Sequence, residues 1–148
     1  MVSKQLELLA RVQKDREEKL EAQFVQAMQF MRQSEQKYQG LADYRTDYIV
    51  QSQQQGAAGL ESRQYSQFIR FIAKLDQALE QQAQQIHQAQ SVVEQRREKW
   101  LAMQKKRKAI DYLLERQQLE QDRKAAKAEQ VLLDEVATQQ FVRRQLLP

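Results

Sequence analysis

The sequence predicts an all-α protein in which two long helices, the second longer than the first, form an antiparallel coiled-coil hairpin. Its 148 residues include only 3 glycines and 1 proline, the residues that most often interrupt helices. Charged residues make up 30% of the chain and the mean hydropathy is −0.84, which suits a narrow seam between two helices better than a thick core. Apolar residues also recur at alternating spacings of three and four on both sides of one glycine-containing break.

The first helix is expected over about residues 4–52. Leu6, Leu9 and Val12 give its start an apolar face in a less regular frame. Gly40 lies inside it and should weaken it locally by about 1 kcal/mol relative to alanine. Its regular stripe alternates in steps of four and three and consists of Leu20, Phe24, Ala27, Met31, Ser34, Tyr38, Leu41, Arg45 and Tyr48.

A turn is expected over about residues 53–62. This segment contains Gly56 and Gly59 and has no core-like periodicity. Ser62 is expected to cap the helix that follows, because a serine side chain can accept a hydrogen bond from a free N–H of the first helical turn.

The second helix is expected over about residues 63–143. Taking Tyr65 as position a of a heptad, the frame continues without a slip as far as Leu114. Its a and d positions are Tyr65, Phe68, Ile72, Leu75, Leu79, Gln82, Ile86, Ala89, Val93, Arg96, Trp100, Met103, Arg107, Ile110 and Leu114. Half of the a and d positions after Leu114 are polar, so the seam decays at that point. Packing is the expected role of Trp100, in preference to contact with a partner.

The point of decay indicates how the two helices pair. If the chain folds back at its glycines, residues face each other when their numbers sum to about 115, which places Leu114 opposite the start of the chain. We therefore expect one coiled-coil domain over residues 1–148, unpaired beyond about residue 115. A second helix intact from Tyr65 to Val142 would be roughly 115 Å long. Because such a hairpin satisfies its own seam, the chain is expected to be a monomer, and the overhang at 117–148 is expected to fray.

Charge supports the same register. Residues 96–108 are strongly basic. Such a run can bind nucleic acid, an anionic lipid surface or an acidic partner. We favour a solvated flank matched to acids across the seam, because opposite charges beside a seam set orientation and register. The expected acidic partners are Glu7, Asp15, Glu17, Glu18 and Glu21.

No constellation of catalytic residues is found, so a non-enzymatic protein without cofactor or metal is expected. The chain has no cysteine, and its single histidine, His87, lies off the seam among glutamines. Gly56 and Gly59 are not followed by the Lys-Ser or Lys-Thr of a phosphate-binding loop. No apolar run is long enough to span a membrane, and the N-terminal stretch lacks the features of a secretory signal. Nucleic acid is not an expected partner.

Aromatic residues gather on both sides of the turn. Tyr48 and Phe68 belong to the seam, whereas Tyr44 and Phe71 fall off it and are expected to have partly exposed rings. Exposed aromatics at the end of a hairpin are typical of a docking surface. Capping of the hairpin end by the same rings is an equal alternative. The cluster consists of Tyr38, Tyr44, Tyr48, Tyr65, Phe68 and Phe71.

Several segments, in this order, resemble the FliJ family, the coiled-coil component of the bacterial flagellar type III export apparatus. Each segment alone is common among coiled coils, so the resemblance rests on the whole set in this order. The set extends over nearly the whole chain. The segments are 41–48 (LADYRTDY), 65–69 (YSQFI), 71–81 (FIAKLDQALEQ), 93–100 (VEQRREKW), 105–110 (KKRKAI) and 114–116 (LER).

The resemblance implies a cytoplasmic protein, peripherally associated with the inner-membrane export apparatus. Its implied partners are the export ATPase ring, in which it would act as a central stalk, the cytoplasmic domain of the export-gate membrane protein, and export chaperones. Lys37 and Gln82 depart from the residues expected of the family, Gln and His, and are left out of the gate contacts. The implied gate contacts are Leu41, Tyr44, Tyr48, Phe71, Leu75 and Ala78.

ATPase contact is implied for the opposite end of the hairpin. No short motif at that end identifies individual contact residues. The residues chosen for ATPase contact are therefore basic residues of that end, Arg11, Lys14, Arg123 and Lys124. Two other interpretations stay open. One is the equivalent stalk of a virulence type III secretion system. The other is a generic scaffold, such as a homo-oligomeric coiled coil or a nucleoid-associated protein, which would need a second chain.

Overall fold

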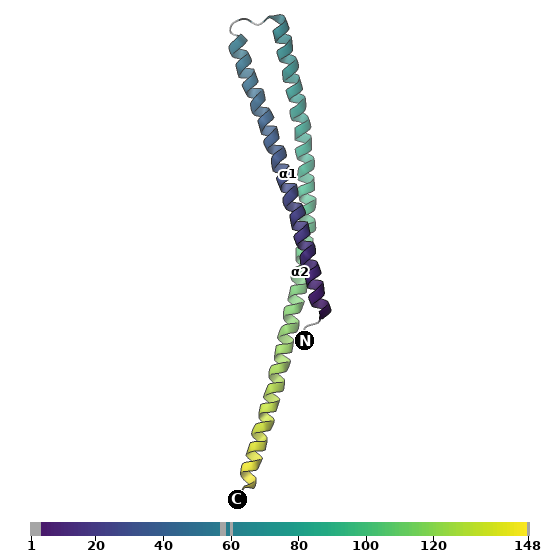
Figure 1. Ribbon diagram of the computed structural model, residues 1–148, viewed down its shortest axis with the longest axis vertical. Helices are drawn as coiled ribbons and strands as arrows, with labels where there is room; N and C mark the ends of the chain where they lie inside the picture. The colour runs from purple at the N-terminus through teal and green to yellow at the C-terminus, as the bar shows by residue number, and fades with distance from the viewer. Residues whose placement is uncertain (1–3, 57–58, 60, 148) are drawn as a thin grey trace. The chain divides into compact units, whose positions relative to one another are not determined.

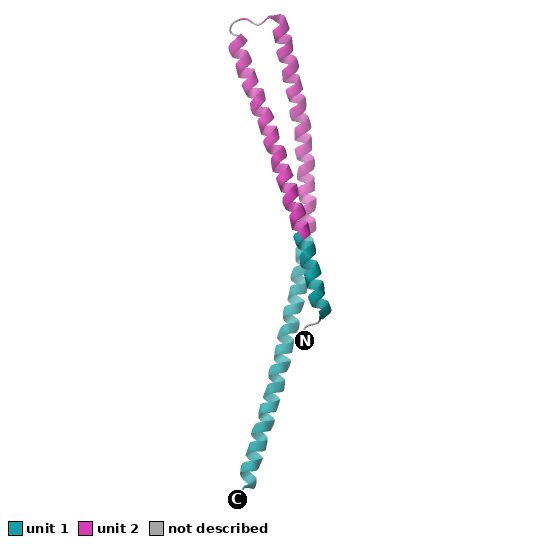
Figure 2. Cartoon of the chain, in the orientation of Figure 1, with its two compact units in different colours: residues 1–18, 102–148 teal, residues 19–101 magenta. Residues whose placement is uncertain are grey.

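The computed structural model describes residues 4–56, 59 and 61–147. Over these residues the chain forms two α-helices and no strand: α1, Lys4–Gly56, has 53 residues and α2, Ser62–Leu146, has 85 (Figure 1). The all-α class, with a longer second helix packed on the first, is therefore confirmed. The chain divides into two compact units, unit 1 with residues 1–18 and 102–148, and unit 2 with residues 19–101 (Figure 2).

The chain reverses direction between Gly56 and Ser62. Gly59 has a φ of 88°, a conformation that glycine adopts without steric cost, and its N–H donates to the carbonyl of Gly56 at 3.0 Å. Residues 57, 58 and 60 of the expected turn lie outside the described residues. Ser62 is the first residue of α2 rather than its cap, because the carbonyl of Glu61 accepts the N–H of Tyr65 at 3.0 Å.

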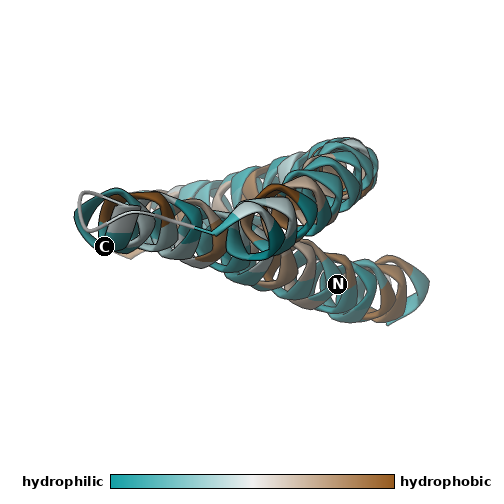
Figure 3. Ribbon diagram, turned by 90° about the horizontal axis from the view of Figure 1, so that it is seen from above, coloured by the Kyte–Doolittle hydropathy of each residue, from teal (hydrophilic) through white to brown (hydrophobic). Residues whose placement is uncertain are grey.

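The predicted seam forms in unit 2. Every predicted a and d position from Leu20 to Tyr48 and from Phe68 to Trp100 is buried or half-buried, with Leu75, Ala89 and Val93 the most enclosed apolar residues. Apolar residues recur among hydrophilic ones along both helices (Figure 3). Tyr65, which the sequence also placed in the seam, is 55% exposed. The α1 seam position that follows Tyr48 by four residues is Ser52, and so small a polar side chain can cover little of a tyrosine ring.

The register agrees with the prediction close to the turn. Facing pairs there have residue numbers that sum to 115 or 116, as in Tyr44 with Phe71 and Tyr48 with Phe68. Phe24 and Trp100, whose rings stack at 5.3 Å, sum to 124. Long helical side chains lean toward the N-terminus of their own helix, so in an antiparallel pair they meet partners of higher number. A lean of about one position for each side chain accounts for only part of the difference, so this ring contact lies off the register found near the turn.

Polar contacts also join the arms of unit 2. The buried side chain of Gln82 donates from Nε2 to the backbone carbonyl of Ser34 at 2.9 Å. Arg45 donates from Nε to Asp76 at 2.6 Å. A buried amide must keep its hydrogen bond, because losing the partner costs about 1–3 kcal/mol. Slippage of one helix past the other would break this bond, so Gln82 favours one register.

In unit 1 the seam holds Glu17, a charged residue that the predicted apolar stripe does not include, opposite the predicted seam residue Arg107. Leu9 and Val12 are 43% and 37% exposed, whereas Glu17 is only 8% exposed. Glu17 accepts a hydrogen bond from Nε of Arg107, and Arg107 also pairs through Nη1 with Asp111 at 2.8 Å. Hydrogen bonding to Glu17 raises the pKa of Arg107 above its usual value, so the Arg107 guanidinium stays charged at neutral pH.

The Glu17–Arg107 pair yields the first prediction. Glu17→Gln and Arg107→Gln should each lower the melting temperature, because each leaves one charge of a half-buried pair without its partner. The double variant should lose less than the sum of the two single losses. Thermal melts followed by far-UV circular dichroism test this in a double-mutant cycle. Strictly additive losses would show that the two side chains do not interact.

Candidate partner-binding sites

Four aromatic rings pack together where the two arms of unit 2 approach the turn. Tyr48 stacks on Phe68 with centroids 5.6 Å apart, and its ring lies 4.5 Å from that of Phe71. Tyr44 meets Phe71 edge to face at 6.1 Å. The rings therefore alternate between α1 and α2 and hold the arms together. We call these four residues, Tyr44, Tyr48, Phe68 and Phe71, the aromatic cluster.

The cluster has one exposed member. Tyr44 is 53% exposed, whereas Phe71 is half-buried against Tyr48. Both off-seam rings are partly exposed, as expected, and Tyr44 is the more exposed of the two. Phe71 lies directly before Ile72 of the seam, and the large facing ring of Tyr48 extends far enough to cover it.

The six residues implied for gate contact lie on this part of unit 2, and the structure brings them together. Leu75 is 7% exposed, so it can support a binding surface but offers little area of its own. Leu41, Tyr48, Phe71 and Ala78 are half-buried, which leaves Tyr44 as the ring most available to a partner. Beside them is a hollow of about 400 Å³, lined by Tyr48, Ser52, Gln55, Gln64, Gln67 and Phe68.

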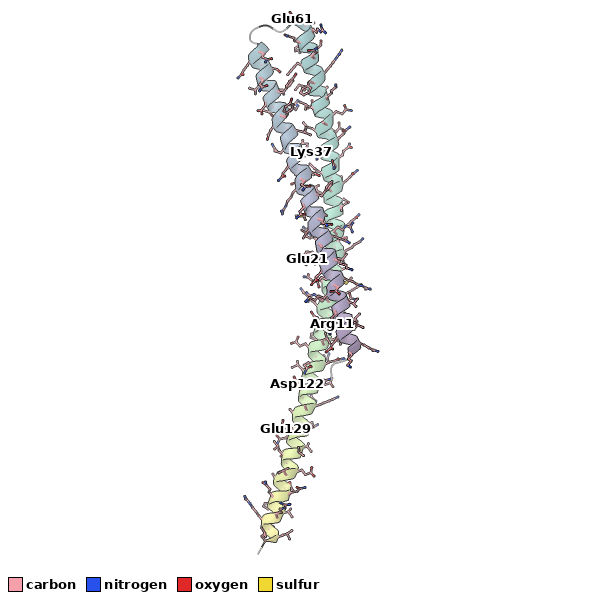
Figure 4. The ribbon with its side chains drawn as sticks, in the orientation of Figure 1. Arg11, Glu21, Lys37, Glu61, Asp122 and Glu129 are labelled. Carbon is pink, nitrogen blue, oxygen red and sulfur yellow. The ribbon has the colours of Figure 1, made fainter. Side chains whose placement is uncertain are left out.

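The four basic residues proposed for ATPase contact do not form one site. All four are exposed and belong to unit 1. Because Glu17 pairs with Arg107 in this unit, Arg11 lies near residue 113, and Arg123 lies about 15 Å further along α2 at 1.5 Å per residue. Lys14 lies one helical turn after Arg11, and Lys124 is 3.9 Å from Glu120 on its own helix. Arg11 and Asp122 are labelled in Figure 4.

The last part of α2 is exposed along its length. Every described residue from 122 to 147 is exposed, including large apolar side chains. Exposure reaches 61% for Phe141 and 60% for Leu132. Contiguous apolar side chains in water indicate an interaction surface. We call residues 122–147 the exposed segment.

The basic run at 96–108 is only partly matched by acids. Of the five acids expected opposite it, Glu17 alone forms an ion pair with it among the residues described by the structure. Arg96 instead donates to Oε1 of Gln23 at 2.9 Å, and Arg97 lies over the ring of Phe24 at 5.6 Å. Continuing the steps of three and four back from Leu20 would have placed Glu17 in the seam. Because Glu17 is charged, it does not belong to the apolar stripe from which the seam was predicted.

No cluster of potential metal ligands occurs within residues 4–56, 59 and 61–147. In the same part of the chain, no helix is both long and apolar enough to cross a membrane. His87 is exposed on unit 2.

Comparison with known proteins gives one match. No curated protein and no solved structure matches the chain. A family model described as "Flagellar FliJ protein" matches residues 3–146, which is nearly the whole chain. The sequence segments that suggested this family lie on the two helices of the structure, in the same order. The chain therefore belongs to the FliJ family, whose members are components of the flagellar export apparatus.

Proposed function

We propose that this protein is a non-enzymatic adaptor of flagellar export, which binds the export gate through the aromatic cluster and the export ATPase through unit 1. The observation that supports the proposal most directly is the half-exposed ring of Tyr44, held in place by Phe71. A ring already fixed by its neighbours loses little side-chain entropy on binding, which is the property of an aromatic anchor.

The gate surface would combine that anchor with the hollow beside Tyr48. Leu41 and Ala78 provide half-buried apolar area around the cluster, and Leu75 supports it from below. Such a patch has an aromatic centre and a polar rim of glutamines, the arrangement typical of a specific protein interface. It would take an apolar segment of the gate protein's cytoplasmic domain.

The ATPase surface would use the exposed segment. This segment is a helix with apolar residues on more than one side, and it has exposed cations at Arg123, Lys124, Arg143 and Arg144. A helix with apolar residues around most of its circumference is stable when it is enclosed by other protein. Enclosure by a ring of ATPase subunits satisfies that requirement. Arg11 and Lys14 would then add charge on α1 of the same unit.

The experiment that tests the gate surface replaces Tyr44. Tyr44→Ala should weaken binding to the cytoplasmic domain of the gate protein by about thirtyfold, corresponding to loss of an anchor of about 2 kcal/mol. Its helicity should remain unchanged, because the ring lies outside the seam. Tyr65→Ala is the matched control, since Tyr65 is 55% exposed, close to the 53% of Tyr44, and lies outside the cluster.

Binding of the purified gate domain to each variant can be measured by calorimetry. Equal affinity of the Tyr44 and Tyr65 variants would contradict a gate surface at the aromatic cluster. ATPase stimulation by the Tyr44 variant should match that of the wild-type protein, because the proposal assigns stimulation to unit 1.

A further inference from the structure

One flank of unit 2 carries an apolar hollow that the aromatic cluster does not use. It has a volume of about 330 Å³ and is lined by Ala27, Phe30, Gln85, Gln88, Ala89 and Val92. Ala27 and Ala89 are seam residues, so small side chains form its floor. Phe30 and Val92 form its sides and are 49% and 42% exposed. The hollow is therefore a shallow apolar groove between the two helices.

The groove lies on one of the two sides of the seam, at heptad positions g and c, counted from Tyr65 as position a in α2 and from Phe24 as position a in α1. We call the g and c positions of residues 23–40 and 81–99 the glutamine flank. All twelve are exposed: seven are glutamine, and the others are Phe30, Lys37, Gly40, Val92 and Lys99. None is acidic.

The acids of the same two stretches lie off this flank. Within residues 23–40 and 81–99, the e and b positions, which form the opposite flank, carry Glu35 and Glu94 together with Arg32 and Arg97, and Glu98 lies at an f position. Glu21 and Lys37, which belong to opposite flanks of α1, are labelled in Figure 4. Acids and arginines thus balance on the opposite flank, whereas the glutamine flank carries two lysines and no acid, and its apolar groove is bordered by cations and neutral amides. An acidic partner would be attracted to that flank.

Gly40 supplies an independent observation. It sits in the interior of α1, where glycine weakens a helix relative to alanine. A Cβ added at Gly40 would meet nothing within 4 Å, so no contact within the described part of the chain requires the missing side chain. Gly40 is exposed at a c position of the glutamine flank. A bare backbone at this position lets another helix approach closely, as small residues do where helices pack.

We propose that the glutamine flank is the docking site for one acidic amphipathic helix of a partner protein, which adds a third helix to the hairpin. Its apolar side chains would fill the groove between Phe30 and Val92, its backbone would pass close to Gly40, and its carboxylates would face Lys37 and Lys99. A second copy of this chain fits less well, because pairing two such flanks would bring like-charged lysines together. The site is separate from the aromatic cluster.

The probe is a synthetic four-heptad peptide with leucine and alanine at its apolar positions and glutamate beside them. A matched peptide with lysine in place of glutamate tests the role of charge. The glutamate peptide should bind the full-length protein at least tenfold more tightly than the lysine peptide, as measured by fluorescence anisotropy. No detectable binding of the glutamate peptide, or equal binding of both peptides, would overturn the proposal.

Variants of the protein localise the binding. Phe30→Ala should weaken binding of the glutamate peptide about fivefold to tenfold, as expected for a half-exposed aromatic contact. Ile69→Ala is the matched control, because Ile69 is 48% exposed but lies at an e position of the opposite flank. Similar losses for both variants would show that the peptide does not select the glutamine flank.

Gly40→Leu tests the close approach. Leucine should raise the melting temperature of the hairpin, because it favours helix over glycine and its Cβ would meet nothing within 4 Å in the described part of the chain. It should nevertheless weaken peptide binding about tenfold by blocking the approach of the third helix. Unchanged peptide binding by the more stable variant would contradict docking beside Gly40. If the wild-type protein instead forms dimers, and the Phe30→Glu variant is a monomer, the flank binds a second copy of this chain. That result would overturn the proposal.

Gate binding separates this inference from the proposed function. Phe30→Ala and Gly40→Leu should leave gate affinity unchanged, because gate contact is assigned to the aromatic cluster. Loss of gate binding in the Phe30 variant, with helicity intact, would show that the two surfaces are one.

Discussion

Removal of residues 122–148 is expected to abolish stimulation of the export ATPase without lowering the melting temperature of the remaining chain. The described part of this segment is exposed throughout. Side chains without tertiary contacts contribute little to stability, so their loss should leave the seam intact. The same apolar side chains would be enclosed by the ATPase, where each supplies contact area. ATP turnover with the purified ATPase should fall to the rate measured without this protein.

The truncation has an internal control. Gate binding by the truncated chain should equal that of the full chain, because the aromatic cluster lies in residues 44–71 of unit 2. Stimulation that persists in the truncated chain would place the ATPase contact within residues 4–121 instead. Arg11 and Lys14 would then be the first positions to replace.

Trp100→Ala is expected to cause the largest loss of stability of any single substitution in unit 2, about 3 kcal/mol. Trp100 lies at an a position and stacks on Phe24 at 5.3 Å, with an angle of 23° between the rings. A thin seam has few other atoms that could move into the space left by an indole. For a chain of this size the melting temperature should fall by about 6–12 °C.

Trp100→Phe is the control for the stacking contact. The indole Nε1 is buried and has no hydrogen-bond partner within the described part of the chain. Phenylalanine keeps an aromatic ring against Phe24 and removes this unsatisfied donor, so the stability should change by less than about 1 kcal/mol. A loss as large as that of the alanine variant would show that the indole nitrogen is satisfied in solution.

The heptad frame explains how much of the fold could be predicted. Leu75, Ala89 and Val93 are enclosed as the frame requires, because a period of 3.5 residues places one face of a helix against its partner. The direction of pairing also followed, since the decay of the seam near Leu114 indicated where the partner helix starts. Both inferences depend on patterns spread over many residues, so no single substitution would have changed them.

Features that depend on one side chain were predicted less well. Tyr44 and Phe71 are both off the frame, yet Tyr48 covers part of Phe71 while Tyr44 is 53% exposed, a difference that heptad position alone does not give. Glu17 is charged and was therefore left out of the seam, although Arg107 provides the partner that allows its burial. Tyr65 fits the frame but is 55% exposed, and the α1 seam position beyond Tyr48 is the small polar Ser52. Each case requires knowledge of the facing residue.

Partner surfaces were the hardest to predict, because coiled coils share the same pattern whatever they bind. The resemblance placed the gate contacts on residues that the structure brings together around Tyr44 and Phe71. The basic residues chosen for ATPase contact rested on charge alone, and the structure separates Arg11 from Arg123. The flank beside Phe30 carries no sequence motif, since its glutamines resemble those of any solvated helix.

The measurement that most directly tests the account is sedimentation velocity of the full-length protein over a range of micromolar concentrations. A chain that pairs its own two helices should sediment as a single species with the monomer mass of 17.6 kDa, independent of concentration. A scaffold that needs a second chain to complete its seam should instead give twice that mass, decreasing on dilution. A stable dimer at micromolar concentration would contradict the intramolecular hairpin and the surfaces placed on it.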